Sequence, residues 1–335
     1  MARRVQFDRL GGPDVLRVRE VDTGSPGAAE VLVRVAAIGL NRADAMFREG
    51  SYFVQPSFPS SLGYEAAGTV EAIGADVPGL AVGDPVAVVP AFSLNDYGTY
   101  GDHVIVPAAA VVPRPAHIEP VTAASVWMAY LTAYGALIDE GGLLPGDHVL
   151  LTAASGGVGL AAIQTARRIG AVPIATVRGT SKRQALLDAG AAAVIDTEAE
   201  DLVARVKEIT GGRGVRLAFD PVAGPGVDTL AEAIAPGGKL LVYGALDPRP
   251  TPLPNAASYP DLSTSMFTIF RVTGDPERLR RAVAFVNAGL GDESLVPVVD
   301  RTFALDDVAE AHRYMESNAQ TGKIVLTVGH DTEAA

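Results

Sequence analysis

The sequence predicts an α/β protein in which a doubly wound parallel sheet is joined to a smaller, β-rich domain. Short strand patterns fill the first 120 residues, and from residue 145 onward strand and helix patterns alternate. A glycine-rich turn follows the first strand of that alternation. A chain of 335 residues has room for two domains, and 48% hydrophobic with 20% charged residues is typical of a globular protein.

Alternating apolar residues predict the strands of the first part. Residues 30–38 (EVLVRVAAI) place β-branched side chains at alternate positions, as a half-buried strand requires. Residues 68–74 and 85–90 are shorter segments of the same kind. Turn signals at 11–14 (GGPD) and 83–84 (GD) punctuate them, so this part is expected to form a small barrel or sandwich.

Strands and helices alternate after Pro120, where the sequence predicts a helix over 120–137. The strands that follow are predicted at 148–153, 172–177, 193–196, 215–219, 239–243 and 266–270. The helices that follow are predicted at 158–169, 181–189, 199–209, 228–234 and 276–287, with a last helix at 306–318. This alternation indicates a parallel sheet whose strands are connected by crossover helices.

Charge and composition exclude several classes of protein. The chain has 27 Lys+Arg against 39 Asp+Glu, a net charge of -12, so we expect it to bind neither nucleic acid nor an anionic membrane. It has no cysteine, and its five histidines lack metal-ligand spacing, so no metal site is predicted. The uncharged run 149–166 contains three glycines and favours a strand, turn and helix over a membrane span. We expect a cytoplasmic protein.

The turn after the strand 148–153 is the predicted dinucleotide site. A pyrophosphate needs backbone N–H groups at a helix N-terminus and no side chain in its way, and Gly156 and Gly157 meet that need. Gly159 lets the helix pack against the strand. We assign Ser155, Gly156, Gly157 and Val158 to cofactor binding; the alternative is a glycine turn selected for close packing alone.

Cations follow the second strand of the alternation. At this position an NAD site places an acidic side chain on the ribose, but this chain has Arg178, with Ser181 and Lys182 shortly after. Cations and hydroxyls hold a 2′-phosphate, so the sequence predicts NADPH rather than NADH. The alternative is a solvated basic loop, although the helix dipole disfavours cations at a helix start.

Several motifs resemble the zinc-free medium-chain dehydrogenases/reductases. They are residues 41–44 (NRAD), 50–52 (GSY), 62–68 (LGYEAAG), the turn with the helix start at 153–164, and 322–326 (GKIVL). The nearest branch is the NADPH quinone oxidoreductases, and the enoyl thioester reductases are close to it. Over essentially the whole chain, the resemblance implies a GroES-like β-barrel catalytic domain (1–122), a Rossmann NADPH-binding domain (123–285) and a return to the catalytic domain (286–335), with an active-site cleft between the two domains.

Zinc-dependent relatives place a cysteine at or beside Asn41 and a histidine at Tyr64, and these ligands are missing here. Without a Lewis acid, alcohol oxidation lacks a means of forming an alkoxide, whereas reduction of a conjugated double bond needs only a hydride and a proton. We therefore expect a zinc-independent, NADPH-dependent reductase of quinones or α,β-unsaturated carbonyls. Two alternatives stay open: an enoyl thioester reductase of a fatty-acid or polyketide pathway, and a non-catalytic NADPH-binding redox sensor.

The resemblance also implies the site residues. It places Asn41, Asp44 and Tyr52 at the reaction centre: Tyr52 as proton donor or carbonyl-orienting group, Asn41 on the nicotinamide ribose or the substrate carbonyl, and Asp44 orienting its neighbours. The alternative role for Tyr52 is a loop aromatic that covers the barrel. The rest of the predicted cofactor set comprises Thr132, Tyr243, Gly244, Phe267 and Lys323, together with Asn41 and the residues of the turn and the cationic loop.

Three further expectations concern single side chains and the edge of the sheet. Arg48 is interpreted either as a contact for an anionic substrate tail or as a solvated loop charge, and Trp127 as a core residue. The segment 265–270 is expected to be the edge strand of the parallel sheet, where unpaired backbone groups can join a second copy. The family resemblance suggests a homodimer formed by two such edges.

Overall fold

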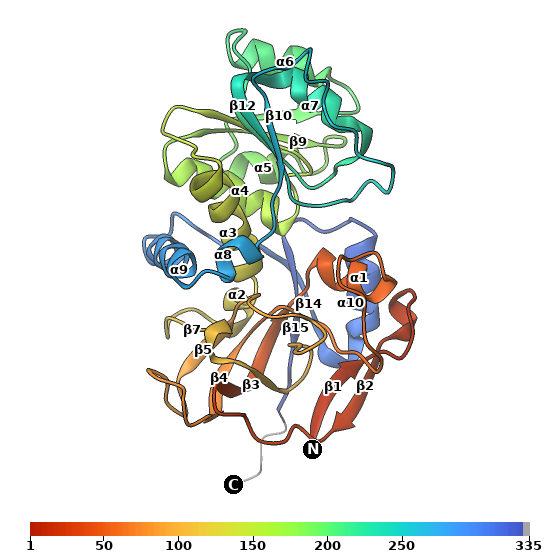
Figure 1. The fold of residues 1–335 in the computed structure, drawn as a ribbon, viewed down its shortest axis with the longest axis vertical. Helices are drawn as coiled ribbons and strands as arrows, with labels where there is room; N and C mark the ends of the chain where they lie inside the picture. Colours follow the sequence, from red (N-terminus) through yellow and green to blue (C-terminus); the bar gives the residue numbers. More distant parts are fainter. Residues whose placement is uncertain (331–335) are drawn as a thin grey trace. The chain divides into compact units, whose positions relative to one another are not determined.

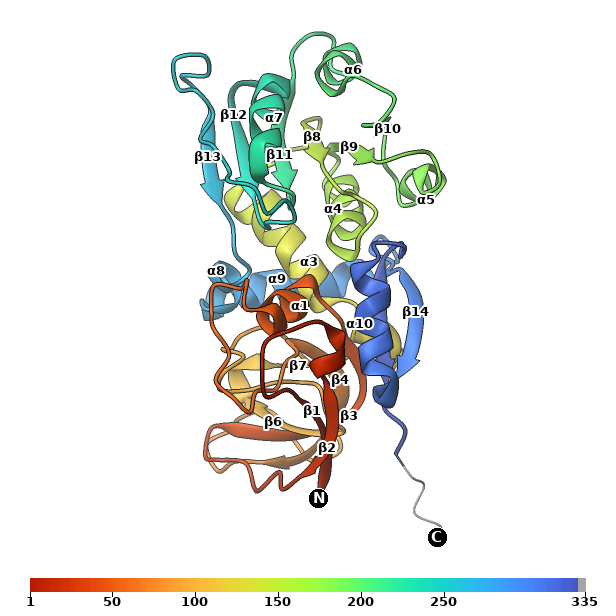
Figure 2. The same ribbon diagram turned by 90° about the vertical axis from the view of Figure 1, so that its right-hand side faces the viewer.

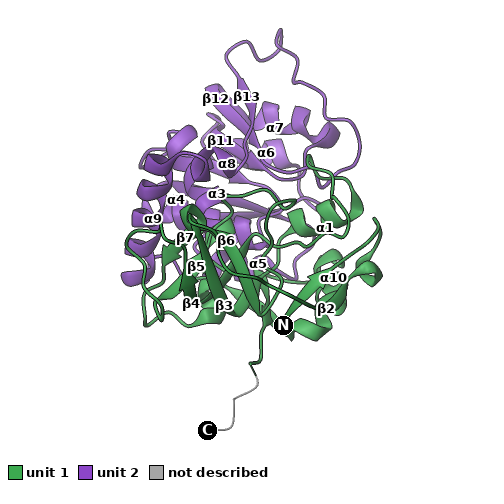
Figure 3. Ribbon diagram, turned by 60° about the horizontal axis from the view of Figure 1, so that its bottom comes forward, with its two compact units in different colours: residues 1–128, 297–335 green, residues 129–296 purple. Residues whose placement is uncertain are grey.

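The computed structural model describes residues 1–330, which fall into two compact units. Unit 1 holds residues 1–128 and the part of the chain from residue 297, and unit 2 holds residues 129–296 (Figure 3). Each unit has its own sheet and hydrophobic core. The assignment of catalysis to residues 1–122 and 286–335, and of NADPH binding to residues 123–285, stays a prediction.

Unit 1 is built around a seven-stranded sheet with the order β14, β15, β3, β4, β5 and β7, and with β6 paired to β3. The strands are β3 Glu30–Gly39, β4 Glu65–Ile73, β5 Pro85–Val88, β6 His103–Pro107, β7 Val111–Pro113, β14 Val299–Ala304 and β15 Lys323–Thr327. A separate antiparallel pair is formed by β1 Ala2–Gln6 and β2 Arg17–Val21. In Figure 1 the red and orange early strands meet blue β15, which lies antiparallel to β3.

The helices of unit 1 are α1 Arg42–Glu49, α2 Pro120–Ala123 and α10 Val308–Glu316, with 3₁₀ turns at Pro13–Val15, Ala108–Ala110 and Leu305–Asp307. Helix α1 starts where the Asp44 carboxylate accepts the N–H of Asn41, and it ends at Gly50, whose φ is 77°. This helix was not predicted from the sequence.

Small residues bring α2 close to β3 and β4: the core there consists of Ala37, Ala67, Ala123, Ala124 and Val325. At Gly39 a Cβ atom would lie 2.0 Å from the carbonyl oxygen of Ala124 and 2.6 Å from Oε1 of Glu65. Only glycine therefore lets the helix and the Glu65 carboxylate approach this strand so closely.

Unit 2 contains a six-stranded, wholly parallel sheet with the order β10, β9, β8, β11, β12 and β13 (Figure 2). The strands are β8 His148–Leu151, β9 Val172–Val177, β10 Ala193–Asp196, β11 Val215–Asp220, β12 Ile234–Val242 and β13 Ser263–Met266. The α-helices that lie entirely within unit 2 are α4 Gly157–Arg168, α5 Arg183–Asp188, α6 Leu202–Ile209, α7 Val227–Ala233, α8 Phe270–Thr273 and α9 Pro276–Gly291, with a 3₁₀ turn at Gly224–Gly226. The strand order reverses between β8 and β11, which confirms the predicted doubly wound sheet.

Two predicted elements need correction. The helix expected over 120–137 is broken: α2 ends at Ala123, α3 spans Trp127–Tyr134, and Gly135–Glu140 is π-helical. The hydroxyl of Ser125 in the break binds the carbonyl of Thr122 at 2.6 Å, a local bond that competes with the continuous helix. The strand expected over 266–270 ends at Met266, and α8 follows, because a short apolar run does not separate strand from helix.

The position of β13 at the sheet edge is confirmed, since it pairs only with β12 among residues 1–330. Within the same residues, no helix combines the length and the apolar character needed to cross a bilayer.

Candidate functional site

The glycine turn of unit 2 leaves its backbone accessible. It connects β8 to α4, and Ser155, Gly156, Gly157 and Val158 are all partly exposed. The first N–H groups of α4 have no partner within the helix. A Cβ built on Gly156 meets no atom within 4 Å, so the space beside the turn is open. The turn can therefore admit a pyrophosphate group.

Gly159 makes a close contact, as predicted, but with the turn residue Ala154 and not with the strand. A Cβ on Gly159 would lie 2.3 Å from the carbonyl oxygen of Ala154, so only glycine lets α4 begin so close to the preceding chain. The two glycines thus serve different ends: Gly156 keeps space free, whereas Gly159 closes a contact.

The predicted cationic loop follows β9. Arg178 and Ser181 are exposed and Lys182 is partly exposed, while α5 starts at Arg183, two residues later than expected. A hydrogen bond anchors the backbone of this loop: Oδ1 of buried Asp196 accepts the N–H of Gly179 at 2.8 Å. The structure therefore presents Arg178 and Ser181 to solvent on an anchored backbone.

The remaining predicted cofactor residues of unit 2 are less exposed. Tyr243 is half-buried and stacks on Phe219, with ring centroids 4.0 Å apart, and Gly244 follows it. Thr132 and Phe267 are buried. Their assignment to cofactor binding stays a prediction.

A buried carboxylate that the sequence did not signal lies where the strand order reverses. Asp220, the last residue of β11, accepts the hydroxyl of Thr152 after β8 and the N–H of Ala223 at 2.6 Å. Burial raises the pKa of Asp220. These bonds tie together the carboxyl ends of the two strands beside the glycine turn, where ligands bind in open α/β sheets.

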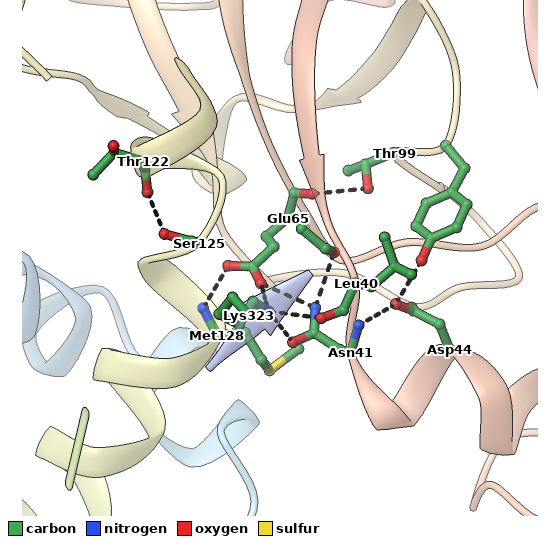
Figure 4. A network of polar contacts seen from close by, with 11 residues as sticks. Leu40, Asn41, Asp44, Glu65, Thr99, Thr122, Ser125, Met128 and Lys323 are labelled. Atoms are coloured by element: carbon green, nitrogen blue, oxygen red, sulfur yellow. Dashed lines mark hydrogen bonds and ion pairs between the residues drawn. The ribbon is translucent and has the colours of Figure 1, made fainter. Parts of the chain in front are cut away.

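In unit 1, Asn41, Glu65 and Lys323 form a closed polar network (Figure 4). The Lys323 ammonium donates to Oδ1 of Asn41 at 2.7 Å, to the carbonyl of Leu40 at 2.7 Å, and to Glu65. The Asn41 amide donates to Glu65 at 3.0 Å and to the carbonyl of Gly39 at 3.2 Å. The other Glu65 oxygen accepts the N–H of Met128 at 2.9 Å.

This network uses most of its own hydrogen-bonding capacity. An ammonium has three hydrogens, and all three of Lys323 have acceptors within unit 1. Its predicted contact with the cofactor would therefore require one of these bonds to open. Glu65, fully buried and absent from the predicted site, is the counter-ion that keeps Lys323 in place.

Asp44 connects this network to α1. Its Oδ2 accepts the N–H of Asn41 at 2.9 Å and the hydroxyl of Tyr100 at 3.1 Å. The side chain is fully buried, and burial raises the pKa of Asp44 to about 7. The structure therefore brings Asn41, Asp44 and Lys323 together, as three of the predicted site residues.

Tyr52 lies just beyond the end of α1, on the segment that follows Gly50. It is half-buried, and its ring lies 4.2 Å from that of Phe53 and 6.3 Å from that of Tyr64. Its hydroxyl shares a hydrogen bond with Tyr64, and burial raises the pKa of Tyr52 to about 12. Tyr52 is therefore protonated at neutral pH and able to donate a hydrogen bond.

Both interpretations of Arg48 are wrong. Its side chain is fully buried, and it donates to Gly11 at 2.8 Å, to Nδ1 of His312 at 2.9 Å and to the carboxylates of Glu49 and Glu316. The local sequence carried no signal for this, because His312 and Glu316 come from α10, more than 260 residues later. Trp127, by contrast, is 2% exposed, which confirms the core prediction.

The described residues 1–330 contain no group of three or more histidine, aspartate and glutamate side chains arranged to hold a metal ion.

Comparisons with known proteins match both parts of the chain. Residues 27–116 match the alcohol dehydrogenase GroES-like domain, and residues 157–288 match the zinc-binding dehydrogenase family. The quinone oxidoreductase of Pseudomonas aeruginosa is 34% identical, over 97% of this chain and 99% of the relative. A phenolphthiocerol/phthiocerol polyketide synthase from Mycobacterium tuberculosis is 35% identical over 98% of this chain, but the chain spans only 15% of that relative.

Solved structures agree with these matches. The Escherichia coli quinone oxidoreductase complexed with NADPH has a TM-score of 0.91 and 32% identity, and covers 97% of this chain and 99% of its own. The quinone oxidoreductase of Pseudomonas syringae has a TM-score of 0.91 and 31% identity, and the match covers 98% of this chain and 100% of the other. A GroES-like domain combined with this doubly wound sheet defines the medium-chain dehydrogenases/reductases. The chain belongs to the quinone oxidoreductase family of that class.

Proposed function

We propose that the protein is an NADPH-dependent reductase that reduces quinones or α,β-unsaturated carbonyl compounds without a metal ion. The observation that carries the proposal is the exposed Arg178 on its anchored loop after β9, in a sheet whose first turn has room for a pyrophosphate. The quinone oxidoreductase relatives, one of them solved with NADPH, support the same activity.

In this proposal unit 2 holds the nucleotide. The N–H groups at Ser155, Gly156, Gly157 and Val158 bind the pyrophosphate at the start of α4. Arg178, Ser181 and Lys182 bind the 2′-phosphate, because a guanidinium and a hydroxyl suit its oxygens and an ammonium adds charge. Bound NADPH supplies the hydride.

Unit 1 supplies the proton and the orienting groups. The protonated Tyr52 hydroxyl donates to the substrate carbonyl oxygen, stabilises the negative charge that develops there, and can pass its proton to the reduced product. Both amide hydrogens of Asn41 are already engaged, whereas its oxygen acts as an acceptor. Asn41 is therefore better suited to accept a ribose hydroxyl than to donate to the substrate.

A second candidate function is reduction of an enoyl thioester. The 35% identity to the polyketide synthase over 98% of this chain favours it. Small quinones and enones are preferred here because a net charge of -12 disfavours the docking of an acidic carrier protein.

The test is NADPH oxidation with 9,10-phenanthrenequinone, 1,4-benzoquinone and a crotonyl thioester as acceptors. We expect turnover with at least one quinone. Turnover with the thioester alone would establish the second candidate. Tight NADPH binding without turnover on any acceptor would favour the redox sensor instead.

We also propose a homodimer, joined through β13, and a cytoplasmic location. Support for the dimer comes from the open edge of β13, where Met266 is 57% exposed. Light scattering at micromolar concentration should give twice the chain mass of 34.6 kDa, and a monomer would contradict the proposal.

A further inference from the structure

A row of buried hydrogen bonds runs through unit 1 from Arg48 to Asp44. Arg48 and Asp44 lie one turn apart on α1, and between their side chains come His312 of α10 and Tyr100, which precedes β6. All four side chains are fully buried. Two distant segments of the chain, the one with Tyr100 and α10, therefore converge on the helix that follows Asn41.

Chemistry fixes the direction of each bond. Arginine only donates, so Nδ1 of His312, 2.9 Å from Nη1 of Arg48, must be the acceptor. The ring hydrogen is then on Nε2, which donates to the Tyr100 oxygen at 3.3 Å. The Tyr100 hydroxyl is left to donate to Oδ2 of Asp44 at 3.1 Å.

This row does not conduct protons. Arg48 at its far end does not deprotonate in proteins. Burial, together with the charges of Arg48 and Arg42, lowers the pKa of His312 to about 3, so the ring is neutral at physiological pH. The row therefore orients hydrogen bonds and cannot refill a proton donor.

We propose that Arg48 and His312 are positioning residues, which aim the Tyr100 hydroxyl at Asp44 and so favour the carboxylate that holds the N–H of Asn41. The inference rests on the proposed reaction, in which Asn41 serves the active site and Asp44 holds the N–H of Asn41. It deepens that proposal by assigning α10 a part in preparing the site.

Other charged and titratable groups face the same residues. Lys323 of β15 favours the Asp44 carboxylate, whereas Glu65 of β4 disfavours it. The Asp44 charge in turn raises the pKa values of Tyr52, Tyr64 and Tyr100. His312 also has Glu316, on its own helix, at 4.0 Å. These groups stay unchanged in the variants below, so a shift reports on the row itself.

The main variants are Tyr100→Phe and His312→Leu, with His312→Gln as the conservative variant, since its amide N–H can replace that of Nε2. Losing the bond from Tyr100 removes a donor from the carboxylate, so the pKa of Asp44 rises further. We expect the acid limb of the kcat/KM profile to move up by about one pH unit in Tyr100→Phe, an approximately tenfold loss at pH 6. His312→Leu should move the acid limb in the same direction, whereas the acid limb of His312→Gln should lie at the wild-type position.

The matched control is Tyr97→Phe, which loses a hydroxyl bonded to Glu30 at 2.7 Å elsewhere in unit 1. Its acid limb should coincide with that of the wild type. An unchanged limb in Tyr100→Phe, or an equal shift in Tyr97→Phe, would overturn the inference.

A second measurement needs no turnover: Tm against pH. Because the folded pKa of Asp44 lies above its ordinary value, its protonated form stabilises the folded chain, and that stability is lost as pH rises through about 7. In Tyr100→Phe the pKa of Asp44 is higher, so this loss of stability continues to higher pH than in the wild type. The difference in Tm between the wild type and Tyr100→Phe should therefore grow between pH 6 and 9. A constant deficit would overturn the inference even if quinone reduction failed for every variant.

Discussion

The turn between β8 and α4 and the network around Lys323 are both polar, but they differ in what they leave open. At the turn, backbone N–H groups stay accessible, and the neighbouring glycine keeps a ligand's space free. Around Lys323, its own ammonium in β15, the Glu65 carboxylate in β4 and the amide of Asn41, just before α1, already satisfy one another's hydrogen bonds. The turn is therefore suited to bind a charged group, whereas the network around Lys323 is suited to fix the positions of its own side chains.

The largest expected effect tests whether unit 1 contributes chemistry through Tyr52, which lies outside the network around Lys323. Tyr52→Phe removes a hydroxyl that we place on the substrate carbonyl, so kcat/KM should fall about 10²- to 10⁴-fold, as for a positioned acid. NADPH affinity should change little. The matched variant Tyr97→Phe should keep near-full activity. An active Tyr52→Phe enzyme would reduce Tyr52 to the alternative role of a loop aromatic.

The next effect is on stability. Lys323→Met leaves the buried Glu65 carboxylate without its counter-ion and should lower the free energy of unfolding by about 3–5 kcal/mol. Urea denaturation measures it. The double variant Lys323→Met with Glu65→Gln should recover much of the loss, because no charge is then left buried. Equal stability of the single and double variants would argue against a coupled pair.

A smaller effect is expected at the open region. Arg178→Ala should weaken NADPH binding about 10- to 100-fold, since a charge-assisted hydrogen bond contributes roughly 1.5–3 kcal/mol. NADH has no 2′-phosphate and should lose far less. The measurement is a titration of NADPH and of NADH against the wild type and against Arg178→Ala. An equal loss of affinity for NADPH and NADH would mean that Arg178 has only a structural role.

The smallest effect separates the two glycines of the turn. Gly156→Ala meets no neighbouring atom, so Tm should hold while NADPH affinity falls about tenfold, because the methyl occupies the ligand's space. Gly159→Ala collides with Ala154 and should lower the free energy of unfolding by about 1–3 kcal/mol. Reversed outcomes would exchange the two roles.

The same contrast explains what the sequence could predict. Strands β9 and β10 have the predicted bounds, and the turn at Gly156 and Gly157 lies between a strand and a helix as expected, because these signals are local. Glu65 and His312 gain their meaning from partners 258 and 264 residues away in the chain. A single sequence carries no record of such pairings, and for this reason the burial of Arg48 was not predicted. Helix α1 did have local signals, the Asn41 and Asp44 cap and Gly50, which were not used to predict it.

The pairing of β15 with β3 has a consequence for how the chain is made. Residues 129–296 form one continuous stretch, so unit 2 can fold as soon as that stretch leaves the ribosome. Unit 1 cannot complete its sheet until β15 has been synthesised. Glu65 has no Lys323 to pair with until the 257 residues between them have also been made. During that interval a carboxylate destined for burial stays hydrated. The sheet of unit 1 is therefore the last part to be finished, and a chain truncated before residue 323 should accumulate with unit 2 folded and unit 1 open.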